Sequence, residues 1–143
     1  MNIARLLAAR SGETISVTRQ TTVTEAVALL AERRIGAVPV LDGDGAPIGI
    51  MSERDVIYNL RSGGSAILDW PVERVMTAPV VTVEPDSTIL GALALMTRRR
   101  IRHLPVVEGK RMIGLVSIGD LVKERMDRIE AEAAAMRDYI QSA

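Results

Sequence analysis

Two short motifs hold the residues that are best suited to bind a ligand. Each reads Gly-x-x-Ser-x-x-Asp, once at Gly49–Asp55 and once at Gly114–Asp120. In both, a predicted strand ends and a predicted helix begins at the serine. A helix N-terminus is suited to meet a phosphate, and a carboxylate held there can accept two hydrogen bonds from a ribose diol. The motifs therefore favour a nucleotide-type ligand.

A purely structural role explains the same residues. Ser52 and Ser117 are good helix N-caps, and Asp55 and Asp120 fall in the first helical turn, where negative charge is favourable. A reciprocal capping box prefers Glu or Gln at this position, because an aspartate side chain is short for reaching back to the cap. Since aspartate occurs there twice, we favour a ligand, and capping stays open as the alternative.

Both motifs belong to a duplicated unit. Thr22–Gly43 aligns with Thr88–Gly109 at a constant offset of 66, and Ile48–Ile57 aligns with Ile113–Val122 at an offset of 65. Of these 32 aligned positions 14 are identical, whereas unrelated segments would share roughly two or three at average residue usage. Repeated units usually bury their apolar faces against each other. The duplication therefore predicts two equivalent clefts related by a pseudo-twofold axis.

Each copy reads strand, helix, strand, strand, helix, which predicts an α/β (α+β) fold. β-Branched alternation indicates strands, apolar residues at helical spacing indicate helices, and glycines indicate the hairpin turns. The predicted strands are 14–18, 37–41, 47–51, 80–83, 103–107 and 112–116, and the helices begin at Thr22, Ser52, 86–88 and Ser117. We expect residues 1–61 to form an N-terminal helix and the first unit, 62–74 a linker, 75–125 the second unit and 126–143 a helical tail.

The last helix is expected to continue from Leu121 to Tyr139. Its apolar residues recur at alternating steps of four and three, as in a heptad seam: Val122, Met126, Ile129, Ala133, Met136 and Ile140. The seam is shorter than the three or four heptads typical of a coiled coil. Two interpretations stay open: a helix that lies along its own domain, and a helix that pairs across a homodimer.

Composition argues against several classes of function. There is no cysteine, so a thiolate metal site is not expected. Eighteen basic residues balance eighteen acidic ones, so general electrostatic binding to nucleic acid or membrane is not expected either. No apolar run approaches the length of a membrane span. His103 is the sole histidine, so neither a catalytic triad nor a metal centre is expected. We expect a cytoplasmic protein that is not an enzyme.

One dense basic run spans Arg98–His103. It has three interpretations: a short nucleic-acid patch, a solvated helix end where cations are favourable, or an anion site. The anion site fits best, because the run delivers Arg102 and His103 to a predicted cleft.

The duplicated unit resembles a tandem of CBS domains, the regulatory module named after cystathionine β-synthase; the pair is called a Bateman module. The resemblance covers residues 1–125 and is carried by the element order, the two Gly-x-x-Ser-x-x-Asp motifs, Ile35-Gly36-Ala37-Val38-Pro39-Val40, Ile101-Arg102-His103-Leu104-Pro105-Val106 and the preceding Val75-Met76-Thr77-Ala78-Pro79. In that family, clefts between the units bind adenosine compounds. The resemblance therefore implies AMP first, with ADP, ATP, NAD or S-adenosylmethionine as the other ligands.

The same resemblance implies roles for individual residues. Asp55 and Asp120 would hold the ribose hydroxyls, with Ser52 and Ser117 near phosphate or ribose. Adenine would lie in an apolar slot by Val38 and Leu104, with backbone groups near Ala37 and His103 at its edge. Arg54, Pro39 and Pro105 complete the expected set.

The resemblance also predicts two unequal sites. In the family, the residues three and two before each proline face the phosphates of the neighbouring site. The Asp55 cleft would therefore receive Arg102 and His103 from across the axis, whereas the Asp120 cleft would receive only Gly36 and Ala37, with its own Arg102. The Asp55 cleft is expected to bind phosphate better.

The function implied is that of an adenine-nucleotide sensor. Because the chain shows no catalytic, channel or transporter domain, it is expected to act as a homodimer or through an unidentified regulated protein. The alternative is an interaction module with empty clefts, in which the serines and aspartates only cap helices.

Overall fold

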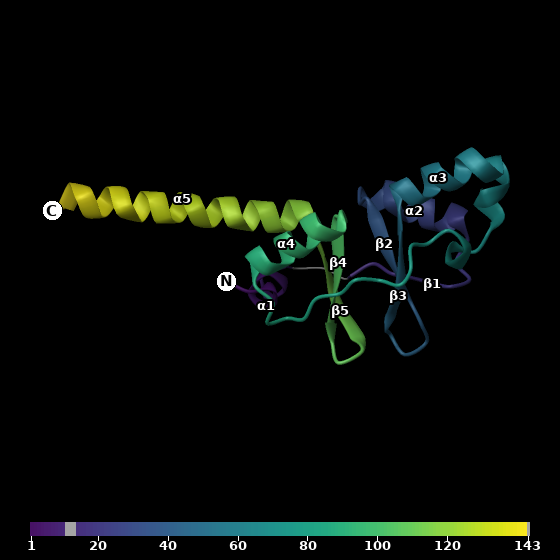
Figure 1. Cartoon of the computed structure of the whole chain (residues 1–143), viewed down its shortest axis with the longest axis horizontal. Coiled ribbons are helices and arrows are strands. Elements are labelled where there is room, and N and C mark those ends of the chain that lie inside the picture. Colours follow the sequence, from purple (N-terminus) through teal and green to yellow (C-terminus); the bar gives the residue numbers. More distant parts are fainter. Residues whose placement is uncertain (11–13, 143) are drawn as a thin grey trace.

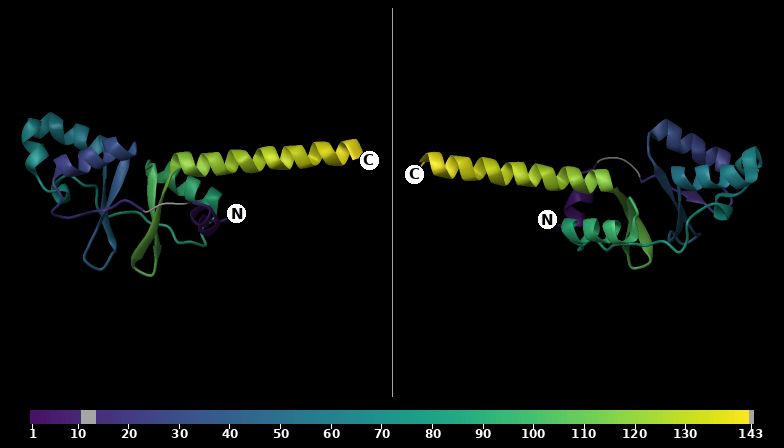
Figure 2. Two further views of the ribbon diagram at one scale, coloured as in Figure 1. Left: turned by 180° about the vertical axis from the view of Figure 1, so that it is seen from behind. Right: turned by 45° about the horizontal axis from the view of Figure 1, so that its top comes forward.

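The computed structural model describes residues 1–10 and 14–142. It consists of two small α+β units side by side and a long helix, α5 (Ile118–Ser142), that projects from the second unit (Figure 1). Two further views show that α5 extends away from both units over most of its length (Figure 2). The mixed α+β fold and the long C-terminal helix agree with the sequence prediction.

The first unit is a three-stranded sheet with two helices. Its strands β1 (Val17–Thr18), β2 (Ala37–Leu41) and β3 (Pro47–Ser52) lie in that order, with β1 parallel and β3 antiparallel to β2. Its helices are α2 (Val23–Arg33) and α3 (Glu53–Gly63), followed by the 3-10 helices η1 (Gly64–Asp69) and η2 (Val72–Arg74). Small aliphatic side chains and one methionine fill its core: Val17, Val23, Ala26, Leu30, Val38, Val40, Met51, Val72 and Val75.

The second unit repeats this plan with a shorter sheet. β4 (His103–Glu108) and β5 (Arg111–Ser117) pair antiparallel beside α4 (Ile89–Arg99) and the start of α5. In place of β1 there is one parallel bridge, between Val83 and Val106. The strands predicted over 14–18 and 80–83 are therefore much shorter than expected. In each unit a turn directly follows the paired residues; the Thr21 N–H donates to the Thr18 carbonyl and the Ser87 N–H to the Glu84 carbonyl.

The helices α2 and α4 begin and end alike. The side chains of Thr22 and Thr88 accept hydrogen bonds from the backbone N–H groups three residues on, at 3.1 and 2.9 Å, which satisfies otherwise unpaired donors. At the other end Arg34 and Arg100 adopt left-handed backbone angles, with φ of 53° and 55°. The two helices therefore end at Arg33 and Arg99, and Arg34 and Arg100 are their C-caps. This tight reversal leads Arg100 and the following residues directly into β4.

Each unit is completed by the segment that leads into the other unit. The helix α1 (Ile3–Ala8) packs on the second unit, where Ile3 and Leu6 enter the core. Conversely, Val72 and Val75 enter the first core. The packing thus corrects the expected grouping of the N-terminal helix with the first unit and of residue 75 with the second. Sequence order alone did not reveal this exchange, because each segment is adjacent in sequence to the unit that it does not complete.

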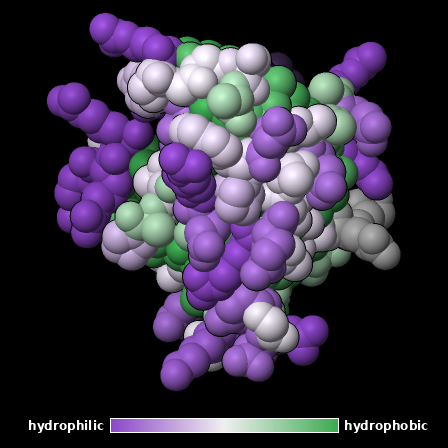
Figure 3. All heavy atoms as spheres, turned by 90° about the vertical axis from the view of Figure 1, so that its right-hand side faces the viewer, coloured by the Kyte–Doolittle hydropathy of each residue, from purple (hydrophilic) through white to green (hydrophobic). Residues whose placement is uncertain are grey.

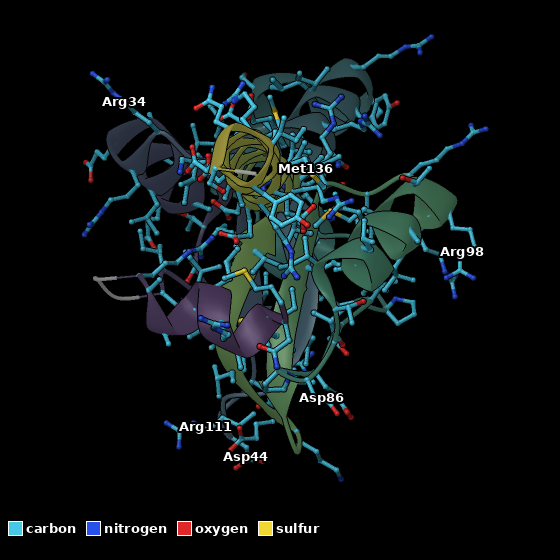
Figure 4. The ribbon with its side chains drawn as sticks, turned by 90° about the vertical axis from the view of Figure 1, so that its left-hand side faces the viewer. Arg34, Asp44, Asp86, Arg98, Arg111 and Met136 are labelled. Carbon is cyan, nitrogen blue, oxygen red and sulfur yellow. The ribbon has the colours of Figure 1, made fainter. Side chains whose placement is uncertain are left out.

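The units also meet through their hairpins. The Met112 N–H donates to the Gly45 carbonyl at 2.9 Å, and Gly45 can take this turn because its φ of 83° suits glycine. Viewed from the α5 end, Asp44 and Arg111 lie together at the bottom of the molecule (Figure 4). The hydrogen bond between Met112 and Gly45 helps to hold the two units side by side.

The outer surface is mostly hydrophilic. The end of the molecule formed by the first unit shows hydrophilic side chains over most of its area, with hydrophobic ones emerging near the level of α3 (Figure 3). There Ile57 is 64% exposed and Leu60 is 40% exposed. Among the helices of residues 1–10 and 14–142, none has the length and apolar character needed to cross a bilayer.

Candidate functional site

A cavity of about 530 Å³ opens between the two units. Its lining comes from the first unit, the connection and the second unit: Gly36, Ile50, Ser52, Glu53, Arg54, Asp55 and Ile57; Thr77, Pro79, Val80 and Val81; and Arg100, Ile101, Arg102 and His103. Small-molecule sites typically have volumes of about 300–1,000 Å³. A ligand held here would contact both units at once.

Asp55 sits at the helix start on one wall of this cavity. Its Oδ2 accepts hydrogen bonds from the Ser52 backbone N–H at 2.8 Å and from the Ser52 hydroxyl at 3.0 Å, while its own N–H donates to Ser52 Oγ at 3.3 Å. The reciprocal capping box is therefore complete. The expectation that aspartate is too short to close such a box is wrong. The capping role and a position on the cavity wall belong to the same side chain.

The second motif closes the same box. The Ser117 N–H donates to Asp120 Oδ2 at 2.8 Å, and the Asp120 N–H donates to Ser117 Oγ at 3.1 Å. Arg10 forms an ion pair with this carboxylate and donates to the Leu115 carbonyl at 2.6 Å. Burial disfavours the charged form of Asp120, but the Ser117 hydrogen bonds and the Arg10 guanidinium hold its pKa below the usual value. Neither Ser117 nor Asp120 lines the cavity.

The carboxylates of Asp55 and Asp120 thus differ in their bonding partners. Thr77 donates its hydroxyl to Asp55 Oδ1 at 2.8 Å, whereas Asp120 meets the cationic Arg10. Both donors come from the segments that are exchanged between the units. A neutral hydroxyl leaves the negative charge of Asp55 uncompensated, while a guanidinium neutralises the charge of Asp120. This difference concerns the carboxylates, whereas the asymmetry predicted from the sequence concerns the residues that would face a phosphate.

Arginine side chains gather on the opposite wall. Arg102 and His103 of the second unit line the cavity that contains Asp55, where the sequence analysis placed them, and Arg100, which was not expected there, lines it as well. Arg54 lies on the wall from the first unit. Cations near a helix N-terminus are suited to bind an anion such as phosphate.

His103 is half-buried where the two units touch. Burial lowers its pKa below the usual value, and this effect outweighs the nearby carboxylates of Asp120 and Glu53, which favour protonation. Gly36 permits the close approach, since a Cβ there would lie 2.8 Å from Glu53 Oε1 and 3.6 Å from His103 Cε1. Burial therefore favours the neutral imidazole, and a bound anion would favour the protonated form.

Seven of the thirteen residues expected at the two sites lie outside this cavity: Ser117 and Asp120, together with five buried residues. Gly36, which was expected at the Asp120 cleft, lines the cavity that contains Asp55. Val38 and Leu104 are fully buried and belong to the two separate cores, so they form no adenine slot. Ala37, Pro39 and Pro105 are buried as well, and none of the five lines the cavity. The physical reason is that the central part of β2 and β4 is covered on both faces, so successive residues there are buried.

The apolar wall comes instead from residues that the sequence analysis did not assign to the site. They are Ile50 on β3, Pro79, Val80 and Val81 of the connection, and Ile101 before β4. A signal for three of them is present in the sequence, because Pro79 closes the Val75–Pro79 segment and a β-branched pair follows it. The site therefore combines an apolar wall, the carboxylates of Asp55 and Glu53, and a cationic wall.

Comparison with known proteins gives the family. A family model described as CBS domain matches residues 11–62 and 72–127. The chain is 35% identical over 134 residues to the CBS domain-containing protein CBSX3, mitochondrial, of Arabidopsis thaliana. The aligned region covers 91% of this chain and 65% of that protein. This chain thus spans less than two thirds of the length of that relative.

Solved structures give the same family and fold. A CBS-domain containing protein from Agrobacterium tumefaciens is 37% identical with a TM-score of 0.82, covering 87% of this chain and 99% of that one. The structure of CBSX2 in complex with AMP shares the fold at 23% identity, with a TM-score of 0.74 and coverage of 88% and 96%. The two stretches matched by the family model coincide with the duplicated units. The chain therefore belongs to the CBS domain family and contains two CBS domains in tandem.

Proposed function

We propose that this protein is a regulatory module that binds an adenine nucleotide, AMP before ADP, ATP or NAD, in the cavity between its two CBS domains. The observation that carries the proposal is the composition of that cavity. Two carboxylates, Asp55 and Glu53, a set of cationic side chains and an apolar wall converge on a space of about 530 Å³. Sugar, phosphate and base of a nucleotide need these three surfaces. The AMP complex of CBSX2, a protein with the same fold, agrees with this choice of ligand.

The proposed arrangement assigns one wall to each part of the ligand. Asp55 already accepts from the Ser52 N–H, the Ser52 hydroxyl and the Thr77 hydroxyl, so one of its about four acceptor sites, on Oδ1, is open to a ribose hydroxyl. The second ribose hydroxyl would take the place of Thr77 or of the Ser52 hydroxyl. The phosphate faces Arg102 and His103. The adenine ring lies against the apolar wall formed by Ile50, Val80 and neighbouring residues.

The proposed regulatory mechanism depends on the fact that both domains line the cavity. Because both CBS domains line the cavity, a nucleotide would interact differently with each relative placement of the two domains. A ligand with such differential affinity shifts the population towards one placement. We propose that this shift is transmitted to a second copy of the chain in a homodimer or to an unidentified regulated protein in the cytoplasm, and that the chain itself is not a catalyst.

A second candidate function has an observation of its own. Both capping boxes are complete, so the serines and aspartates have a structural role even without a ligand. In this alternative the protein is an interaction module that binds no nucleotide. The cavity with its unequal charges favours the first proposal.

Thermal unfolding with added ligand separates the two candidates. Binding at a free concentration one hundred times Kd stabilises by about 2.7 kcal/mol, which raises the midpoint by roughly 5–10 °C for a domain of this size. We expect AMP to give such a shift. No shift with millimolar AMP, ADP, ATP, NAD or S-adenosylmethionine would favour the interaction module.

A pair of substitutions in the basic run tests the placement of the phosphate. Arg102→Gln removes a cation that lines the cavity and should weaken AMP binding by about tenfold or more, since hydrogen bonds to charged groups contribute about 1.5–3 kcal/mol. Arg98→Gln is the matched control, because Arg98 is exposed on α4 (Figure 4) and lies outside the cavity lining. Adenosine, which lacks phosphate, should bind both variants equally. Equal loss of AMP binding in both variants would contradict the placement.

A further inference from the structure

The long helix α5 carries most of the exposed apolar side chains of the described structure. Of thirteen large hydrophobic residues that are exposed, seven lie on this helix: Ile118, Val122, Met126, Ile129, Met136, Tyr139 and Ile140. Only its beginning packs on the second unit, through the fully buried Leu121. Beyond residue 126 every residue except Ala134 is exposed as far as Ser142. Figure 2 shows this part of the helix standing clear of the body, so α5 does not lie along its own domain.

The exposed residues form one continuous stripe. Val122, Met126, Ile129, Ala133, Met136 and Ile140 alternate in steps of four and three, which places them at the a and d positions of a heptad. Successive residues on a helix are about 100° apart, so this seam lies roughly a quarter turn from Leu121. The seam therefore faces sideways, and a partner helix can reach it without displacing the second unit.

The charges beside the seam indicate which partner fits and in which direction. The g positions hold Arg125, Glu132 and Tyr139, and the e positions hold Lys123, Glu130 and Arg137. In a parallel, in-register pair of identical helices, each g residue meets the e residue five positions on in the other copy. Arg125 then meets Glu130 of the second copy, and Glu132 meets Arg137 of the second copy. All these contacts are attractive.

In an antiparallel pair of α5 helices with full overlap, the corresponding contacts are repulsive. Pairing Met126 with Met136 of the second copy places Glu130 against Glu130 and Glu132 against Glu132. Like charges at such positions are destabilising. Within one helix Glu132 accepts from Arg128 at 3.3 Å, but an exposed pair of this kind contributes only about 0.3–0.5 kcal/mol and can be exchanged for a contact between helices.

We propose that α5 is a dimerisation helix that pairs with α5 of a second copy of this chain, parallel and in register. The proposal does not depend on nucleotide binding. The twofold axis runs along the paired helices and places the two bodies on opposite sides of the pair. Because the seam is short, the dimer should be concentration dependent.

Single cysteines test the direction, since the chain contains none. Met126→Cys lies directly opposite itself in the parallel pair, within the 4.4–6.8 Å Cα separation that a disulfide allows. In the antiparallel pair the two cysteines would be ten residues, or about 15 Å, out of step along the axis. We expect mild oxidation to link Met126→Cys into dimers. Ala131→Cys, on the outer face of the same helix, is the matched control and should stay monomeric.

A mixture of two single-cysteine variants gives the decisive comparison. Met126→Cys mixed with Met136→Cys should yield linked pairs of each variant with itself. Mixed 126–136 pairs as the main product would show an antiparallel helix pair and overturn the proposed direction.

Sedimentation equilibrium tests the pairing itself. The unmodified protein should form a concentration-dependent dimer, Met126→Asp with Ile129→Asp should be monomeric, and Ala131→Asp should behave as the unmodified chain. These residues are exposed, so circular dichroism should show the two domains still folded. A monomer at all concentrations, or a dimer that survives the two seam substitutions, would overturn the proposal.

Discussion

The two aspartates should respond differently to the same substitution. Replacing aspartate with asparagine keeps the size of the side chain and an acceptor for the serine N–H, so both capping boxes remain. The negative charge is lost, and one of the two acceptor oxygens becomes an NH2 donor. Asp55 lines the cavity, while Asp120 lies outside it and is already paired with Arg10.

The expected difference is large. Hydrogen bonds to a charged group contribute about 1.5–3 kcal/mol, so Asp55→Asn should weaken AMP binding by roughly 10- to 150-fold. Asp120→Asn should change the affinity of the first AMP by less than about twofold, because additivity holds for groups that share no ligand contact. Isothermal titration calorimetry at one pH and salt concentration measures both. If Asp120→Asn abolishes binding while Asp55→Asn leaves it intact, our ranking of the two sites is wrong.

Three further predictions follow from single contacts. Arg10→Ala removes an exposed ion pair of about 0.2–1 kcal/mol. It should improve the affinity for a second AMP by at most about fivefold, measured by calorimetry. An unchanged affinity for the second AMP would refute the role of Arg10 at that site. Gly49→Ala places a Cβ 2.5 Å from Met76 Sδ and 3.0 Å from a backbone carbonyl, so it should cost about 1–3 kcal/mol of unfolding free energy. Gly114→Ala meets only the mobile end of a leucine at 2.8 Å and should cost less, as urea midpoints would show; equal costs would contradict this account. Because burial lowers the pKa of folded His103, the unfolded chain binds that proton more readily and stability should fall as pH drops below about 6.5; His103→Gln should flatten this fall in urea titrations at pH 7 and 5.

The repeat made much of the fold predictable. Residues that act locally gave correct predictions: Thr22 and Thr88 cap their helices, the glycine turns close both hairpins, and Ser52 and Ser117 begin the helices that follow β3 and β5. These features depend on contacts over three or four residues, which a sequence displays directly.

The errors concern contacts over long separations. Val38 was expected beside a ligand, but it is fully buried in the core of the first unit. The continuous apolar run Ala37–Leu41 is typical of a strand that is covered on both faces. Arg10 was not assigned to any site, although it meets Asp120 across 110 positions of the chain. Both positions depend on the exchange of segments between the two domains, in which α1 packs on the second domain and Val72 and Val75 pack in the first. This exchange is visible only in the folded structure.

The length argument about Asp55 failed for a different reason. A short side chain closes a capping box when the backbone at the cap brings the N–H near, as the 2.8 Å contact with Ser52 shows. The capping and ligand roles are therefore compatible, and the motif alone does not distinguish between them. What favours a ligand is the cavity and the charges that line it.

The sole histidine offers the most direct test of the central claim. His103 lines the cavity, and the chain holds no other imidazole, so its NMR signal needs no assignment. If AMP binds with its phosphate against Arg102 and His103, the nearby anion should raise the pKa of His103 in a titration of the imidazole signal with pH. Adenosine should leave that pKa nearly unchanged, and Asp55→Asn should require much more AMP for the same effect. An imidazole titration that saturating AMP does not alter would contradict the proposed site.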